Sequence, residues 1–169
     1  LNLASRRYSS FPGIARKGLE TIVAHIGDAI MHARHEQQVA ETKNNLESLF
    51  NTIDDLLFIV GMDGKVIATN AAVGKTLGYK PGKAEGRHVV DFHPADRQDE
   101  ARLTIGKMIN GTETSCKVPL VTTGGALVPV DTKVTKGVWD KKPVLFGISR
   151  NISDLVRSQQ DLIENRQQF

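Results

Sequence analysis

Two short apolar runs separated by a turn signal form the clearest pattern in the chain. The residues Leu56 to Val60 are all apolar, and Asp63-Gly64 separates this run from a second one, Lys65 to Thr69. An Asp-Gly pair between two apolar runs favours a tight hairpin, because the turn needs a positive φ at its centre. We therefore predict two antiparallel strands here, followed from Asn70 by a short helical segment that ends at Gly78-Tyr79.

The second half of this region predicts one helix and three more strands. The helix is expected over Pro94 to Ile109, and the strand-like segments are Thr114–Thr122, Leu127–Val138 and Pro143–Asn151. Period-two alternation places three sets of residues on common faces: Cys116, Val118 and Leu120; Val128, Val130 and Val134; and Val144, Phe146 and Ile148. Two strands, helices and three strands with one apolar face predict an α+β fold with a five-stranded antiparallel sheet covered by helices on one face.

Helical patterns flank this unit on both sides. From about Gly13 to Ile53, apolar residues recur at spacings of three and four, and Val39, Leu46 and Ile53 are spaced by sevens with Leu49 between them. The stripe shifts around His32–Glu36, which indicates either a stutter in one long helix or a break between two helices. A shorter, weakly apolar helix is expected after Ile152, and we expect it to need a partner helix.

Composition narrows the class of protein. The chain has 169 residues, of which 40% are hydrophobic and 24% charged, as in soluble globular proteins. No apolar run is long enough to cross a bilayer, and the single cysteine, Cys116, excludes an internal disulfide and a cysteine-based zinc site. We therefore expect a cytoplasmic protein. A net charge of +3 from scattered basic residues, with 5% aromatic residues, argues against nucleic-acid binding.

Residues 47–153 resemble a PAS domain. The residues that carry the resemblance are Asp63, Gly64, Asn70, Ala72, Gly78, Tyr79, Gly86 and the segment Phe92-His93-Pro94-Ala95-Asp96-Arg97. The last segment is similar to the His-Pro-Asp-Asp-Arg sequence that opens the long helix of many such domains. Arg150-Asn151-Ile152-Ser153 is similar to the Arg-Asp-Ile-Thr junction that joins PAS sheets to output helices, with Asn151 in place of the acid.

The first residues resemble the end of a GAF domain. Leu1-Asn2-Leu3-Ala4-Ser5 and the helical segment Leu19 to Ala33 are similar to its last strand and final helix. The chain lacks an initiator methionine, so we expect it to be part of a longer protein. The two resemblances imply a bacterial or archaeal multidomain sensor such as a histidine kinase. They divide the chain into four parts: a GAF-like remnant over 1–35, a linker or coiled-coil helix over 36–53, a PAS domain over 54–153 and an output helix over 154–169.

Catalytic and metal-binding motifs are missing from the sequence. It contains no Ser-His-Asp set, motif of paired carboxylates or glycine-rich phosphate loop. His35-Glu36 is similar to the start of the phosphoacceptor box of histidine kinases, but Gln37-Gln38 follow where that box continues differently. His25, His32 and His35 share a helix flank without the four ligands of a closed zinc site. We expect no enzyme activity and no metal in this fragment, while its parent protein could be a histidine kinase.

The resemblance also raises the question of a cofactor. Light-sensing PAS relatives carry a flavin-adduct cysteine before the long helix, whereas Cys116 is expected on a strand, where a small core side chain is the simpler interpretation. Noncovalent haem held by His88 or His93, or a small apolar ligand, remains open, and we assign no cofactor. The expected pocket or core lining is Ile59, Ile67, Asn70, Leu77, Phe92, Leu103, Val118, Val130, Val134 and Phe146; Trp139 is expected at a surface or an interface.

These observations predict a regulatory sensor module. We expect a change in the pocket to pass through Arg150, Asn151, Ile152 and Ser153 into the outgoing helix and a downstream signalling domain. A homodimer is expected through the flanking helices, with contacts from Val39, Leu46, Leu49 and Ile53. The alternative is a dimerisation and protein-interaction module that binds no ligand.

Overall fold

The computed structural model describes residues 13–167, which form two compact units, one ending at Glu47 and one beginning at Ser48. The expected strand Leu1–Ser5 lies outside the described residues. The first unit is most of α1 (Gly13–Thr52), a single uninterrupted helix. Because this helix runs through His32–Glu36 without a break, the sequence pattern there corresponds to a continuous helix. The apolar side chains Ile26, Ile30, Val39 and Leu46 on it are all exposed.

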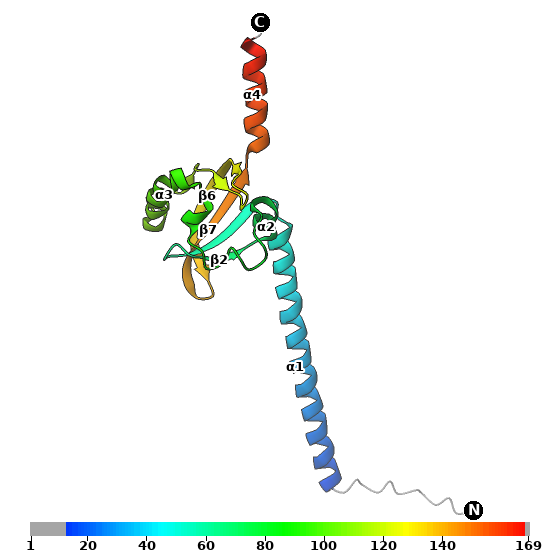
Figure 1. Ribbon diagram of the computed structural model, residues 1–169. Coiled ribbons are helices and arrows are strands. Elements are labelled where there is room, and N and C mark those ends of the chain that lie inside the picture. Colours follow the sequence, from blue (N-terminus) through cyan, green and yellow to red (C-terminus); the bar gives the residue numbers. More distant parts are fainter. Residues whose placement is uncertain (1–12, 168–169) are drawn as a thin grey trace, which may run out of the picture. The chain divides into compact units, whose positions relative to one another are not determined.

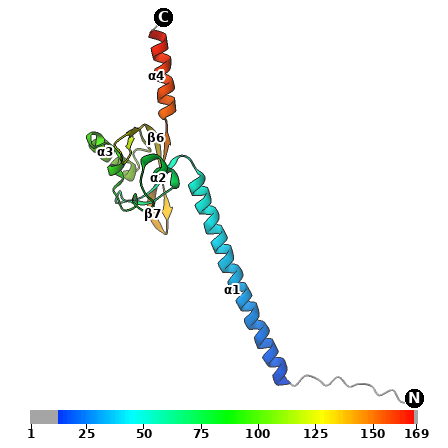
Figure 2. The ribbon, with the colours of Figure 1, turned by 45° about the vertical axis from the view of Figure 1, so that its right-hand side comes forward.

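The second unit is a five-stranded antiparallel sheet of the expected type (Figure 1). Its strand order is β2-β1-β7-β6-β3. The strands are β1 (Leu56–Gly61), β2 (Val66–Thr69), β3 (Ser115–Cys116), β6 (Val130–Trp139) and β7 (Lys142–Asn151). Figures 1 and 2 show these strands side by side with the helices α2 (Ala71–Leu77) and α3 (Gln98–Asn110) packed against them. The 3-10 turns η1 (Val89–Phe92) and η2 (Ala95–Arg97) lead into α3.

The predicted Asp-Gly hairpin is confirmed. Gly64 has φ of 79°, and the amide of Gly61 donates to the carbonyl of Lys65 at 2.8 Å. The second hairpin is tighter than the sequence suggested. Only Asp140 and Lys141 separate β6 from β7, and both have positive φ, as the preferred two-residue loop requires.

Two of the three strands expected in the second half are interrupted, and proline is the reason. The segment Thr114–Thr122 divides into β3 and β4 (Leu120–Val121), because Pro119 has no amide to donate to a ladder. Likewise Pro129 separates β5 (Leu127–Val128) from β6. The short strands β4 and β5 pair with each other in a separate ladder. The expectation of two unbroken strands was therefore wrong.

The core lies between the sheet and the helices. Leu56, Phe58 and Val60 alternate along β1 toward it, and Val73, Leu77, Ile105 and Met108 of α2 and α3 complete it. Cys116, Val118 and Leu120 are all buried, as the alternation predicted. On β7 the alternate residues that face the core are not the set that the sequence predicted. Leu145, Gly147 and Ser149 face the core, while Phe146 and Ile148 lie on the other face.

The outer face of the sheet is therefore partly apolar. Ile148 is 46% exposed, and Trp139, 44% exposed, packs edge-on against Phe146 with ring centroids 6.5 Å apart. The Phe146 ring also lies over Gly137, where a Cβ would collide with it. The sequence prediction that Trp139 is a surface or interface aromatic agrees with this exposed position.

The helix α4 (Ser153–Gln167) follows directly on β7. Asn151 precedes this helix, and its Oδ1 accepts hydrogen bonds from the Ser153 amide at 2.9 Å and the Ser153 hydroxyl at 2.6 Å. The amide of Ile152 donates to the carbonyl of Pro129 at 3.0 Å. The Asn151 side chain thus supplies a hydrogen-bond acceptor to the first residue of α4.

Candidate functional site

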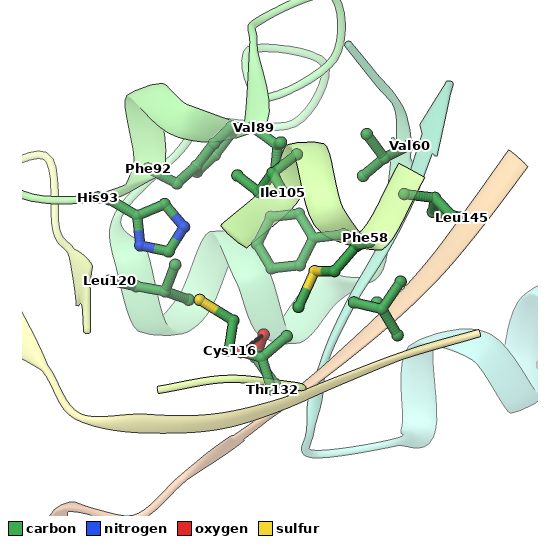
Figure 3. Close-up of a pocket in the computed structure, with 14 residues that line it drawn as sticks. Phe58, Val60, Val89, Phe92, His93, Ile105, Cys116, Leu120, Thr132 and Leu145 are labelled. Carbon is green, nitrogen blue, oxygen red and sulfur yellow. Dashed lines mark hydrogen bonds between the residues drawn. The ribbon is translucent and has the colours of Figure 1, made fainter. Parts of the chain in front are cut away.

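A small apolar cavity lies between the inner face of the sheet and α3. Its volume is about 50 Å³, large enough for a few water molecules and well below the ~300 Å³ of the smaller organic-ligand sites. Figure 3 shows His93, Leu120 and Cys116 on one side of it and Val60 and Leu145 on the other. The lining residues are Phe58, Val60, Val89, Phe92, His93, Ile105, Met108, Cys116, Leu120, Thr132, Val134, Leu145, Gly147 and Ser149.

A row of polar side chains crosses the sheet beneath this cavity. Cys116 lies directly opposite Thr132, which in turn lies directly opposite Ser149, so the three belong to neighbouring positions on β3, β6 and β7. The Thr132 and Ser149 hydroxyl oxygens are 2.7 Å apart and hydrogen bonded. Ser149 is 2% exposed, so its buried hydroxyl obtains its hydrogen bond from Thr132 and not from solvent. Neither hydroxyl was predicted, because apolar alternation alone does not identify polar residues on the core face of a strand.

His93 closes the cavity from the helical side. It follows η1 and is 5% exposed, and its Nδ1 lies 2.9 Å from the carbonyl oxygen of Pro119. A carbonyl can only accept, so Nδ1 carries the hydrogen and Nε2 keeps its lone pair. Burial lowers the pKa of His93, and the nearby Arg97 guanidinium lowers it further, against the opposing effect of the Pro119 and Val118 carbonyls and of Glu100. The ring is therefore neutral at physiological pH.

Cys116 is a buried thiol. It is 5% exposed, and burial raises its pKa, so the thiol keeps its proton at physiological pH. This agrees with the prediction that Cys116 is a small core side chain. Its position at the cavity wall, facing His93 across Leu120 in Figure 3, was not foreseen.

Burial of His93 predicts a loss of stability in acid. Between the lowered pKa of the folded state and the ordinary histidine pKa of about 6.5, the unfolded chain binds a proton that the folded chain does not. The His93 contribution is thus full above about pH 6.5 and decreases as the pH falls below it, by at most about 1.4 kcal/mol per pH unit. Urea unfolding near pH 7.5 and near pH 5.5 measures the change. His93→Gln should be less sensitive, and equal sensitivity in both proteins would contradict this assignment.

The ten predicted pocket residues fall into different places. Phe92 and Val134 line the cavity. Ile59, Leu77, Val118 and Val130 are buried elsewhere in the domain. Ile67 and Leu103 do not line the pocket, since they are 40% and 70% exposed. The amphipathic face of α3 that meets the sheet carries Ala101, Ile105 and Met108 instead of Leu103. Phe146 is on the outer face of the sheet, because neighbouring side chains of β7 point to opposite faces and Leu145 and Gly147 face the core.

Asn70 does not line this cavity, and its side chain bonds the segment before β1. It is 2% exposed, and its Nδ2 donates to the carbonyls of Ile53 at 3.0 Å and Asp55 at 2.9 Å. Its Oδ1 accepts from the Leu57 amide at 3.0 Å. One side chain thus fixes the segment that joins α1 to β1. Asn51, in the last turn of α1, accepts a hydrogen bond from the Ala71 amide at 2.9 Å.

The residues expected to pass a signal surround the end of β7. Arg150 lies 3.7 Å from the carboxylate of Asp55, which precedes β1, but 73% of its side chain is exposed, so the ion pair is weak. Asn151 and Ser153 form the cap of α4, and Ile152 is half-buried and bonded to Pro129. These four residues therefore connect the sheet with the start of α4.

The cavity does not accommodate haem in its present shape. Haem is a drug-sized ligand, for which sites of several hundred Å³ are usual, whereas the cavity holds about 50 Å³. His88, one proposed ligand, is outside the cavity lining. Its Nδ1 accepts from the Val90 amide at 3.3 Å, and its ring packs against Gly64. His93 lines the cavity, with Nδ1 engaged by the backbone.

Two further findings concern only the part of the chain that the structure describes. None of its helices combines the length and apolar character needed to span a bilayer. It also has no group of three or more histidine, cysteine, aspartate and glutamate residues placed to hold a metal ion. His25, His32 and His35 are exposed on α1.

Comparisons with known proteins agree on the fold. A family model described as "PAS fold" matches residues 50–136. A PAS domain structure from Desulfitobacterium hafniense is 27% identical, with a TM-score of 0.56, and covers 64% of this chain and 98% of its own. The PAS domain of an HTR-like protein from Haloarcula marismortui is 20% identical, with a TM-score of 0.62, over 70% of this chain and 98% of its own.

Two other similar proteins have names that refer to sensing. A PAS domain from a two-component sensor histidine kinase has a TM-score of 0.57 at 13% identity, covering 67% of this chain and 98% of its own. The curated "Methyl sulfide methyltransferase-associated sensor" of Methanosarcina acetivorans is 22% identical over 134 residues. That match covers 79% of this chain and only 13% of the relative, so the chain spans a small part of that protein's length.

Proposed function

The chain belongs to the PAS-fold family, whose members are sensory domains of signal transduction, and from this premise we propose how it senses and transmits. A change in the contents or packing of the cavity between sheet and α3 alters β7, and β7 passes the change to α4. The output is a shift between two packings of α4 with its partner helix, which requires only a few kcal/mol of differential free energy.

One observation carries this proposal: a single strand connects the cavity with the outgoing helix. Leu145, Gly147 and Ser149 of β7 line the cavity, and the strand ends at Asn151, whose side chain caps α4. A displacement of β7 that follows a change in the cavity therefore acts directly on the first turn of α4. No intervening loop is available to absorb it.

Filling the cavity from β7 tests this coupling. At Gly147 a Cβ would meet Phe58 and Val134 at 3.8–4.0 Å, which is ordinary contact, so Gly147→Ala is tolerated and Gly147→Val projects methyl groups into the cavity. We expect Gly147→Val to change amide hydrogen exchange in the first turns of α4. The control Thr135→Ile adds bulk on the exposed outer face of β6 and should leave that exchange unchanged. Unchanged exchange in folded Gly147→Ala and Gly147→Val would contradict the proposal.

We further propose a homodimer within a larger cytosolic signalling protein, in the manner of a sensor histidine kinase. The support is the stripe of exposed apolar residues on α1 and beyond it, with Val39 56%, Leu46 62%, Leu49 66% and Ile53 46% exposed. A solvent-exposed stripe of this kind is stabilised by a partner helix. A preceding GAF-like part over 1–35 and a downstream signalling domain after α4 belong to the same proposal.

The dimer has a direct test. The double variant Leu46→Glu and Ile53→Glu introduces like charges into the stripe, and we expect it to shift the chain from dimer to monomer in analytical ultracentrifugation. Gln37→Glu and Lys43→Glu, which change exposed positions already polar, serve as the control. A dimer that survives the Leu46 and Ile53 changes would contradict the assignment of this interface.

The alternative, a protein-interaction module without a ligand, is favoured by the small size of the cavity. About 50 Å³ leaves no room for an organic cofactor. An absorption spectrum of the purified protein, followed by mass spectrometry of its denatured extract, separates the two functions. A bound small molecule supports the sensor, and a protein that is consistently empty supports the interaction module.

A further inference from the structure

We propose that a polar groove beside α2 binds a small zwitterion, a molecule that carries one ammonium and one carboxylate group, as a free α-amino acid does. The groove lies between the last turn of α1, the end of β2, α2 and the loop that follows α2. Its volume is about 560 Å³, within the roughly 300–1,000 Å³ that is usual for small-molecule sites. It shares no lining residue with the cavity between the sheet and α3, so the inference does not depend on the sensing proposed above.

Glu85 supplies the observation that points to a ligand. Its Oε1 accepts a hydrogen bond from the Thr69 hydroxyl at 2.8 Å, whereas its Oε2 is buried and has no hydrogen-bond partner. Among the side chains that the structure describes, no other buried nitrogen or oxygen atom is in this condition. A carboxylate oxygen removed from solvent without a donor is unfavourable, so a donor from outside the chain is expected to meet it.

A ligand in the groove can supply that donor. Glu85 is itself part of the groove lining, as is Thr69, to which it is bonded. The terminal torsion of a glutamate side chain has a broad range, so the carboxylate turns toward a bound donor at little cost. An ammonium group suits this position best, because it donates a charge-assisted hydrogen bond and also neutralises the carboxylate.

Two lysines define the other end of the ligand. Lys75 of α2 and Lys80 of the following loop also line the groove. Among the ion pairs of residues 13–167, none joins Glu85 to either lysine. An organic cation alone would be repelled by the two lysines, and an anion alone would leave the Glu85 carboxylate unpaired. A zwitterion gives its ammonium group to Glu85 and its carboxylate to the lysines, and so satisfies both ends of the groove.

Asn51 connects this groove with the incoming helix. It lies in the last turn of α1, and its Oδ1 accepts a hydrogen bond from the Ala71 amide at 2.9 Å. Its Nδ2 group is thereby left as a donor at the wall of the groove, where a ligand carboxylate can accept from it. Binding is therefore expected to act where α1 enters the domain, whereas the cavity described above acts where β7 leaves it.

The test is isothermal titration calorimetry of the whole chain with glycine, L-alanine, L-leucine and L-phenylalanine. Each is compared with the corresponding amine, which lacks the carboxylate, and the corresponding carboxylic acid, which lacks the ammonium group. We expect at least one amino acid to bind with one molecule per chain. Its amine and its acid should each bind at least about tenfold more weakly, because each loses one charge-assisted interaction.

Variants of the groove locate the site. Glu85→Gln should weaken binding by at least about tenfold, since it removes the charge that pairs with the ammonium group. It keeps the acceptor for Thr69 and removes an unpaired buried charge, so its free energy of unfolding should not fall. Lys75→Met and Lys80→Met should each weaken binding by about two- to fivefold, as expected for exposed ion pairs.

Matched controls come from the same chain. Glu164→Gln and Lys83→Met change exposed side chains outside the groove lining, so neither should alter the affinity. Failure of all four amino acids to bind at millimolar concentration would overturn the site. So would an amine or an acid that binds as tightly as its amino acid, or equal effects of Glu85→Gln and Glu164→Gln. Such a failure leaves the coupling of β7 to α4 untouched, because Gly147 lines the other cavity.

Discussion

Replacing Phe92 with alanine is expected to lower the free energy of unfolding by about 4 kcal/mol. The Phe92 ring is fully buried and packs between two other rings, with centroids 5.4 Å from Phe58 and 5.0 Å from Tyr79. Truncation removes both aromatic contacts and enlarges the cavity that Phe92 already lines, and the surrounding strands can collapse only in part. Urea denaturation followed by circular dichroism measures the loss.

Phe146→Ala is the matched control. It removes the same side chain from the outer face of the sheet, where Phe146 is only partly buried against Trp139 and Gly137. The loss should be about half that at Phe92 or smaller, because solvent can fill the vacated space. Equal losses at the two positions would mean that the core does not lie on the side of the sheet assigned here.

Asn70→Ala is expected to lower the free energy of unfolding by about 3 kcal/mol. The substitution leaves the carbonyls of Ile53 and Asp55 and the amide of Leu57 without their side-chain partner. These groups belong to the segment between α1 and β1, so amide exchange of that segment should accelerate before global unfolding. Both the unfolding free energy and exchange protection at Leu57 report on this effect.

Two further substitutions control for the loss of an amide side chain as such. Asn51→Ala removes a single hydrogen bond, to the Ala71 amide, and should cost about 1 kcal/mol. Asn70→Asp keeps the acceptor for the Leu57 amide but loses both donated hydrogen bonds. It should lower the free energy of unfolding by more than Asn51→Ala does, because the buried carboxylate would face two carbonyls. If Asn70→Ala were no more costly than Asn51→Ala, the proposed fixing of this segment would be refuted.

Local signals in the sequence were enough to predict the architecture. The Asp63-Gly64 turn determines the first hairpin, because few residues other than glycine adopt φ near 79° without cost. The alternation of Cys116, Val118 and Leu120 correctly identified a buried face. These features depend on neighbours in the chain, so they can be read without knowledge of the tertiary structure.

The details of the site depended on contacts that the sequence pattern does not contain. The more apolar alternate residues of β7, Val144, Phe146 and Ile148, were expected on the core face. The core face instead carries Gly147 and Ser149. A polar residue can face the core when a strand beside it supplies a partner, and Thr132 does so from β6. The hydrogen bond between the His93 ring and the Pro119 carbonyl likewise joins residues that are 26 positions apart, so no local pattern predicts it.

The pairing of β1 with β7 has a consequence for how such a domain is placed in a protein. Leu56, the first residue of the sheet, lies directly opposite Ser149, two residues before β7 ends. Their Cα atoms are therefore only about 5 Å apart, as in any antiparallel pair. The chain enters and leaves the domain at nearly one point, so the whole domain can be inserted into, or deleted from, a longer polypeptide while the flanking segments stay close together. Modules with this property can be arranged in series without redesign of the segments between them.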